Sequence, residues 1–193
     1  MTEDEVLAEF RACDALLSGH FLLSSGRHSA NYLQCARLLM NPERAGRIAL
    51  AIVQMLPREL RGRIDKVVAP AMGGIIIGHE VGRALGCDAL FLERPTGTFE
   101  FRRGFALEPG DKVLMVEDVV TTGLSSREAM AAVAAAGAEV IALASIVDRS
   151  GGDAAFEVPF HPLVALNFPT YAAHELPAEL AALPATKPGS RAA

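Results

Sequence analysis

The sequence has little of what several large classes of protein require. Its 193 residues contain three cysteines, two tyrosines and no tryptophan. Three scattered cysteines without a CxxC pair argue against a disulfide framework and against a zinc site. We therefore expect Cys13, Cys35 and Cys87 to be reduced thiols in a reducing compartment.

Basic clusters and long apolar runs are also missing. Lys and Arg number 18 against 23 Asp and Glu, which gives a net charge of −5, and no basic block occurs. This balance argues against a nucleic-acid partner, so an anionic ligand would have to be captured locally. No apolar run approaches the ~20 residues of a membrane span, and the acids Glu3, Asp4 and Glu5 are unlike a signal peptide. We expect a cytoplasmic protein without a membrane partner.

Three common motifs fail at particular residues. Gly73 and Gly78 have the spacing of a phosphate-binding P-loop, but His79 and Glu80 stand where Lys and Ser or Thr should follow. No GxGxxG occurs, which removes the dinucleotide-binding fingerprint. The His79-Glu80 pair lacks the second histidine of a zinc protease.

Apolar runs alternate with helical patterns along the middle of the chain. The expected buried strands are 64–69, 88–92, 113–116 and 140–147. They are preceded by a helix that begins with a Thr2/Glu5 capping box and ends near Gly19. Residues 20–35 follow this helix and are expected to form a β-hairpin or two short strands with a polar turn. The alternation predicts an α/β fold with a mostly parallel central sheet flanked by helices. We expect one domain over residues 1–184 and a flexible tail over 185–193.

The most informative stretch is residues 112–130, KVLMVEDVVTTGLSSREAM. Its apolar run, 113–116, is typical of a parallel strand buried on both faces, and Glu117 and Asp118 end the run. Open α/β sheets bind their ligands at the carboxyl ends of strands. Paired carboxylates at such an end suit vicinal hydroxyls or a bound Mg²⁺.

A small-residue turn, residues 121–125, follows these acids. Ser125 and Glu128 have the spacing of a capping box for a helix that stops near Gly137. Helix N-termini leave N–H groups without partners and carry partial positive charge. The turn is therefore expected to bind an anion such as phosphate.

The stretch EDVVTTGLS, Glu117 to Ser125, resembles the 5-phosphoribosyl 1-diphosphate (PRPP) signature of the type I phosphoribosyltransferases at every defining position. The resemblance implies the fold of that family, with a small N-terminal hood beside the central sheet. It implies that Glu117 and Asp118 hold the ribose 2′- and 3′-hydroxyls and that Thr121 to Ser125 hold the 5′-phosphate. The complete set of implied PRPP contacts in this stretch is Glu117, Asp118, Val119, Val120, Thr121, Thr122, Gly123, Leu124 and Ser125.

Three further segments are similar to the orotate phosphoribosyltransferases, so the resemblance extends from about residue 20 to residue 152. FLLSSGRHSANYLQ resembles the segment that opens those enzymes, PAMGGIIIG their pyrophosphate loop, and IVDRSGG the segment with an arginine near orotate. The resemblance implies transfer of the 5-phosphoribosyl group from PRPP to orotate, giving orotidine 5′-phosphate and pyrophosphate in pyrimidine (UMP) biosynthesis. It also implies a homodimer, and Mg²⁺ bound mainly through PRPP or pyrophosphate with no separate metal site on the protein.

The same resemblance assigns roles to single residues. Asp118 is expected to stabilise the cationic ribose, and Arg94, which opens a mobile loop, to contact pyrophosphate; these are the two catalytic candidates. Arg149 is placed near the orotate carboxylate, with Thr121 also able to reach the base. Weaker candidates are Tyr32, beside the base, and the other loop cations, Arg102 and Arg103. The alternatives are a turn arginine paired with Asp148 for Arg149, and a surface cation for Arg94.

The chain departs from the family pattern in three places. Gly73 stands where many members have a lysine, the stretch after Arg94 has no Lys or His, and Ser24 replaces a lysine before the Ser-Gly turn. Two other functions therefore stay open. One is a phosphoribosyltransferase for a purine or another base, which would share the PRPP site. The other is a regulator that binds PRPP as a sensor.

Overall fold

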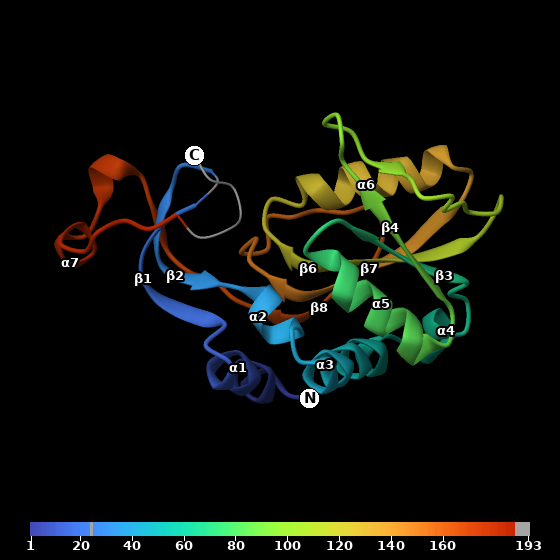
Figure 1. Cartoon of the computed structure of the whole chain (residues 1–193), viewed down its shortest axis with the longest axis horizontal. Coiled ribbons are helices and arrows are strands. Elements are labelled where there is room, and N and C mark those ends of the chain that lie inside the picture. The colour runs from blue at the N-terminus through green and yellow to red at the C-terminus, as the bar shows by residue number, and fades with distance from the viewer. Residues whose placement is uncertain (24, 188–193) are drawn as a thin grey trace.

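A six-stranded sheet forms the body of the computed structural model, which describes residues 1–23 and 25–187 (Figure 1). The strand order is β5-β4-β3-β6-β7-β8. The strands are β3 (Lys66–Pro70), β4 (Asp88–Glu93), β5 (Glu100–Phe101), β6 (Lys112–Val120), β7 (Glu139–Asp148) and β8 (Phe160–Ala165). All neighbouring pairs are parallel except β4 with β5. The predicted α/β class and mostly parallel sheet are confirmed.

Helices cover both faces of this sheet, with α6 on one side and α3 and α5 on the other (Figure 1). The helices are α1 (Glu3–Ala12), α2 (Cys35–Leu39), α3 (Pro42–Met55), α4 (Arg58–Arg61), α5 (Gly74–Leu85), α6 (Leu124–Ala135) and α7 (Ala178–Ala181), with a 3₁₀ turn at Ala173–Glu175. Among the described residues, no helix is long and apolar enough to span a bilayer.

Strand β6 lies in the middle of the sheet and contributes to two separate cores. Successive side chains of a strand point to opposite faces. Leu114 and Val116 belong to the core under α3 and α5, whereas Val113 and Met115 belong to the core under α6. This alternation fixes the direction of the two acids that follow.

A smaller sheet stands beside the main one. It consists of β1 (Leu16–Leu22), β2 (His28–Leu33) and β9 (Thr170–Tyr171) in that order, so the expected hood also receives a strand from the C-terminal part. Thr186, inside the segment expected to be a tail, pairs with β1: its N–H donates to the carbonyl of His20 at 2.8 Å. Residues 188–193 of that segment, and Ser24, lie outside the described residues.

The first helix is shorter than the sequence predicts. The Thr2/Glu5 capping box is present, but α1 ends at Ala12 rather than near Gly19. Asp14 has a φ of 50°, which breaks the helix, and Leu17 already pairs with Tyr32 in the β1–β2 hairpin. Pairing with the hood strand has overridden the helical spacing.

The β6–α6 junction also differs in detail. The strand continues past the two acids to Val120, and Gly123 is the N-cap of α6 with a left-handed φ of 73° and no side-chain cap. The expected capping box is wrong, because Ser125 already lies within the helix and the carboxylate of Glu128 pairs with Arg94.

Candidate active site

Glu117 lies on the α6 face of β6 and is almost fully buried, with 6% of its surface exposed. Its Oε1 accepts a hydrogen bond from Ser126 Oγ at 3.3 Å. Ser145 lies opposite Glu117 on β7 and is also buried, and its hydroxyl makes no hydrogen bond among the described residues. Burial, followed by the neighbouring Asp118 charge, raises the pKa of Glu117 to about 8. The Glu117 carboxyl is therefore largely protonated at neutral pH.

Asp118 points to the opposite face, toward the start of α5. Its Oδ1 accepts the N–H of Val119 at 2.9 Å, and burial raises its pKa although backbone hydrogen bonds oppose the shift. A Cβ atom on Gly73 would stand only 2.5 Å from Asp118 Oδ2. The glycine that replaces the family's lysine thus leaves room for this carboxylate.

Tyr32 of the hood lies near Asp118 and Arg149. Burial raises the pKa of Tyr32, as do the charges of Cys35 and Asp118, while Arg149 opposes the shift. Burial likewise raises the pKa of Cys35 well above its usual value. The hood therefore brings an aromatic ring to the carboxyl end of β6.

Arg149 follows β7 directly and is half-buried. Its guanidinium carbon lies 5.3 Å from the centroid of the Phe168 ring, and its Nε has no partner within residues 1–23 and 25–187. Asp148 instead accepts a hydrogen bond from the N–H of Ser150 at 2.7 Å. Burial lowers the pKa of Arg149, because removal from water disfavours the charged form of the guanidinium. The alternative of a turn arginine paired with Asp148 is wrong.

The turn between β6 and α6 exposes its two threonines. Thr122 Oγ1 accepts the N–H of Leu124 at 3.3 Å, and the first hydrogen bond into the helix joins Arg127 N–H to the carbonyl of Gly123 at 3.0 Å. The N–H groups that precede Arg127 in α6 have no partner in the helical ladder. This arrangement is suited to binding an anion.

A cavity of about 530 Å³ opens beside this turn. Its lining residues come from the loop after β3, the loop after β4 and the start of α6: Ala71, Met72, Ile75, Phe91, Glu93, Arg94, Pro95, Phe99, Arg102, Arg103 and Ser125. All three arginines expected from the mobile loop thus face one cavity, next to the turn.

Each of the three loop arginines forms an ion pair with a glutamate carboxylate. Arg94 forms an ion pair with Glu128 of α6. Arg103 donates two hydrogen bonds to Glu93, at 2.8 and 3.2 Å, and Arg102 lies 3.8 Å from the same carboxylate. An anion entering the cavity would compete with these acids for the arginines.

Sequence reasoning does not point to Met72 or Phe99, and it predicts a helix-capping role rather than an ion pair with Arg94 for Glu128. Met72 is 83% exposed in the loop after β3, and the guanidinium carbon of Arg94 lies 4.1 Å from the centroid of the Phe99 ring. Their place beside the cavity follows from the meeting of separate loops, which spacing along the chain does not reveal.

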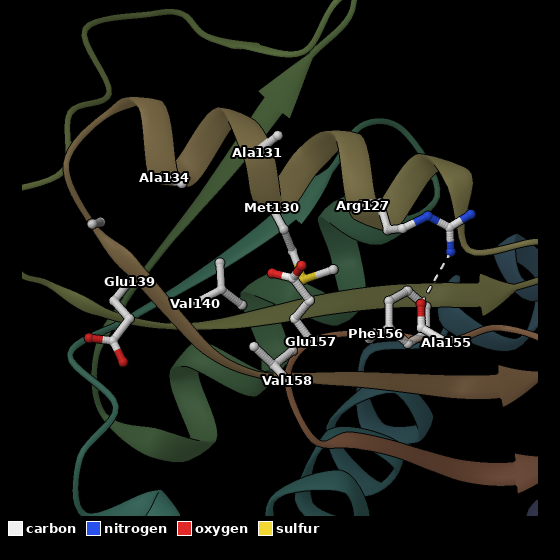
Figure 2. A pocket seen from close by; sticks show the side chains of 11 residues that line it. Arg127, Met130, Ala131, Ala134, Glu139, Val140, Ala155, Phe156, Glu157 and Val158 are labelled. Atoms are coloured by element: carbon white, nitrogen blue, oxygen red, sulfur yellow. Dashed lines mark hydrogen bonds between the residues drawn. The ribbon is translucent and has the colours of Figure 1, made fainter.

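A second cavity, of about 720 Å³, lies between α6 and residues 155–158 (Figure 2). It is lined mainly by apolar side chains such as Met130, Val140 and Phe156. None of the three loop arginines lines this second cavity, whereas all three line the smaller one. The smaller cavity is therefore the one suited to an anionic substrate.

The described part of the chain contains no group of three or more His, Cys, Asp or Glu residues placed to hold a metal ion. Mg²⁺ commonly binds through one or two carboxylates together with substrate phosphates and several waters. Asp118, with its carboxylate against Gly73, fits such a shared site when a phosphorylated ligand brings the ion.

Comparisons with known proteins agree with this geometry. A family model described as "Phosphoribosyl transferase domain" matches residues 36–157. The orotate phosphoribosyltransferase of Novosphingobium aromaticivorans is 72% identical over 192 residues, which cover 100% of this chain and 99% of the relative. That of Caulobacter vibrioides is 53% identical over 191 residues, covering 99% of this chain and 98% of the relative.

Among solved structures, the orotate phosphoribosyltransferase of Aeropyrum pernix matches with a TM-score of 0.66 and 24% identity, covering 83% of this chain and 93% of that one. This likeness shows the fold, which confirms the expected type I phosphoribosyltransferase architecture. The family match and the full-length identities go further. The chain belongs to the orotate phosphoribosyltransferase family, within the phosphoribosyl transferase domain proteins.

Proposed function

We propose that the chain transfers the 5-phosphoribosyl group of PRPP to orotate, forming orotidine 5′-phosphate and pyrophosphate in pyrimidine (UMP) biosynthesis. The observation that carries this proposal is that three loop arginines and Ser125 of the anion-binding turn line one cavity, and that this turn directly follows the strand that carries the two acids. Family membership supports the substrate pair, because the similar proteins are named orotate phosphoribosyltransferases over their full length.

The turn and the acids are assigned to the phosphoribosyl group. Residues 121–125 bind the 5′-phosphate through backbone N–H groups and hydroxyls. Asp118 and Glu117 hold the ribose hydroxyls. Because Glu117 is largely protonated, it donates a hydrogen bond to a hydroxyl without adding a second negative charge beside the phosphate. Asp118 supplies the negative charge that stabilises a cationic ribose.

The reaction breaks the bond between ribose C1 and the pyrophosphate oxygen while an orotate nitrogen attacks C1. Negative charge builds on the leaving pyrophosphate, and positive charge builds on the ribose. A million-fold acceleration requires at least ~8 kcal/mol of stabilisation specific to the transition state. Arg94 is proposed to leave Glu128 and contact pyrophosphate, with Arg102 and Arg103 as the other cations available in the same cavity.

The base is assigned to the space between the hood and β7. Arg149 binds the orotate carboxylate through its planar guanidinium, which fits a carboxylate better than a lysine would. The Nε of Arg149 makes no hydrogen bond among the described residues, so it can donate one to the orotate carboxylate. Thr121 reaches the base from the turn, and Tyr32 lies beside it.

Four further assignments belong to this proposal. Mg²⁺, which the family uses with PRPP, would be held mainly by PRPP oxygens near Asp118 and would neutralise charge on the leaving group. The protein is proposed to act as a homodimer in the cytoplasm, a location consistent with its three free cysteines. Residues 1–184 are proposed to form one domain.

A base panel tests the function. Purified protein, PRPP and Mg²⁺ are mixed with orotate, adenine, guanine, hypoxanthine or uracil, and product is followed by absorbance and chromatography. Orotate is expected to be consumed in step with pyrophosphate release. A purine consumed in preference to orotate would favour the purine alternative, and PRPP binding without consumption of any base would favour the sensor.

A further inference from the structure

Arg127 of α6 reaches back to the turn that precedes its own helix. Its Nη2 donates to the carbonyl oxygen of Thr122 at 3.1 Å, and its Nη1 donates to the carbonyl oxygen of Ala155 at 3.3 Å. Ala155 belongs to the segment that follows β7, so one guanidinium joins two loops from separate parts of the chain. Figure 2 shows the Arg127 guanidinium at one end of the second cavity, the one between α6 and residues 155–158.

The surroundings of this guanidinium are closely packed. A Cβ atom on Gly123 would stand 2.8 Å from Arg127 Nη1 and 2.8 Å from Phe156 Cζ. The guanidinium carbon lies 5.9 Å from the centroid of the Phe156 ring. Across residues 1–23 and 25–187, no carboxylate lies within ion-pair distance of Arg127, so its two hydrogen bonds go to carbonyl groups.

The bond to Thr122 controls the direction of the next N–H group. A peptide group is planar and trans, so its C=O and N–H point in opposite directions. Because Arg127 holds the Thr122 carbonyl on its own side, the Gly123 N–H is turned to the other side. An unheld Thr122 carbonyl would be free to present a partially negative oxygen to an anion bound at the turn.

We propose that Arg127 is a positioning residue for the phosphate-binding turn, and that it aligns the backbone donors that bind the 5′-phosphate of PRPP. It also ties this turn to the segment after β7, whose first residue is Arg149. The inference rests on the proposed assignment of residues 121–125 to the 5′-phosphate. Since the phosphate is bound alike in ground and transition states, losing this alignment weakens binding more than it slows the chemical step.

Two substitutions separate positioning from charge. Arg127→Lys keeps the positive charge, but an ammonium group lacks the planar fork that holds two carbonyls in fixed directions. Arg127→Ala removes both charge and fork. Arg83→Ala is the matched control, because Arg83 is 62% exposed on α5, pairs with Glu80 and lies outside the cavity.

The test is calorimetric binding of ribose 5-phosphate, which carries the 5′-phosphate without the diphosphate, together with steady-state kinetics and melting temperature. Both Arg127 variants are expected to weaken ribose 5-phosphate binding and raise the KM for PRPP about tenfold, as the loss of hydrogen bonds from a charged group predicts. The KM for orotate and kcat should change less than about twofold. Arg83→Ala should match the wild type.

Three results would overturn the positioning role. Wild-type affinity for ribose 5-phosphate in Arg127→Lys would mean that charge alone matters. Equal losses in both KM values and kcat, in proportion to a lower melting temperature, would mean a general structural role. Wild-type behaviour of both variants would mean no role. If the wild type itself consumed no orotate with PRPP, the proposed function would fail instead, and ribose 5-phosphate binding would still report on Arg127.

Discussion

The carboxylate of Asp118 occupies the space that a side chain at Gly73 would need. A Cβ atom on Gly73 would stand 2.5 Å from Asp118 Oδ2 and 2.7 Å from its Cγ. The backbone of Gly73, with φ of −59° and ψ of −38°, is open to any residue, so the constraint is steric rather than conformational. The glycine at this position, where many family members have a lysine, and the placement of Asp118, the proposed catalytic acid, are therefore linked.

Gly73→Ala should displace the Asp118 carboxylate and lower kcat/KM for PRPP. A shift of about 1 Å in a catalytic group costs up to ~10²-fold in rate. Gly62→Ala is the control, because a Cβ there would meet nothing closer than 3.8 Å. Steady-state kinetics of the three proteins check the prediction, and unchanged kinetics in Gly73→Ala would show that Asp118 relaxes without consequence.

Asp118→Asn should reduce kcat by ~10²-fold or more, because the neutral amide no longer stabilises the cationic ribose. The fold should persist, since the hydrogen bond that the Asp118 side chain accepts from the N–H of Val119 is local. Circular dichroism and single-turnover kinetics distinguish these effects. Asp88→Asn, at an exposed strand start, serves as the control. Near-normal turnover in Asp118→Asn would remove Asp118 from the mechanism.

Arg94→Ala should raise the KM for PRPP or lower kcat by about 10–100-fold, as expected when a cation at the leaving group is lost. Glu128→Gln should have the opposite effect on PRPP binding, because Arg94 no longer has to leave an ion pair. The gain should not exceed about fivefold, since partly exposed ion pairs contribute only ~0.2–1 kcal/mol. The two single variants and the double variant form a cycle. An Arg94→Ala enzyme with wild-type kinetics would make Arg94 a surface cation.

The pKa of Glu117, raised to about 8, predicts a pH dependence of stability. Between about pH 5 and pH 8 the folded state binds a proton that the unfolded state has released, so the free energy of unfolding falls as pH rises. This residue contributes a slope of at most ~1.4 kcal/mol per pH unit. Glu117→Gln should remove that slope.

Urea unfolding of the wild type and Glu117→Gln from pH 5 to pH 9 measures how the free energy of unfolding changes with pH. Glu59→Gln, an exposed change on α4, should keep the wild-type slope. Identical slopes in the wild type and Glu117→Gln would show that Glu117 titrates at its ordinary pKa in the folded protein.

Much of the fold was predictable because its signals are local. Four apolar runs predict the central strands. The Asn41-Pro42 pair is a local start signal of the same kind for α3, where the Asn41 side chain accepts the N–H of Arg44. The end of α1 was not predictable from spacing, since Leu17 belongs to β1 only because Tyr32 lies opposite it. The C-terminal strand β9 depends on the same kind of long-range pairing.

The candidate site likewise has a part that was predictable from local sequence and a part that was not. The acids and the turn are contiguous in sequence, so their chemistry was visible there. The opposite directions of Glu117 and Asp118, and hence the different surroundings of the two acids, follow from the extension of β6 to Val120. The pairing of Arg94 with Glu128 joins residues from different loops, and no motif encodes it.

Isothermal titration of PRPP into the protein in the presence of magnesium tests the central claim most directly. The arrangement of turn, acids and arginines predicts saturable binding with one PRPP per chain, weakened when Arg94 is replaced by alanine. Millimolar PRPP that produced neither heat of binding nor a rise in melting temperature would contradict the account, and the assignment of orotate would fall with it.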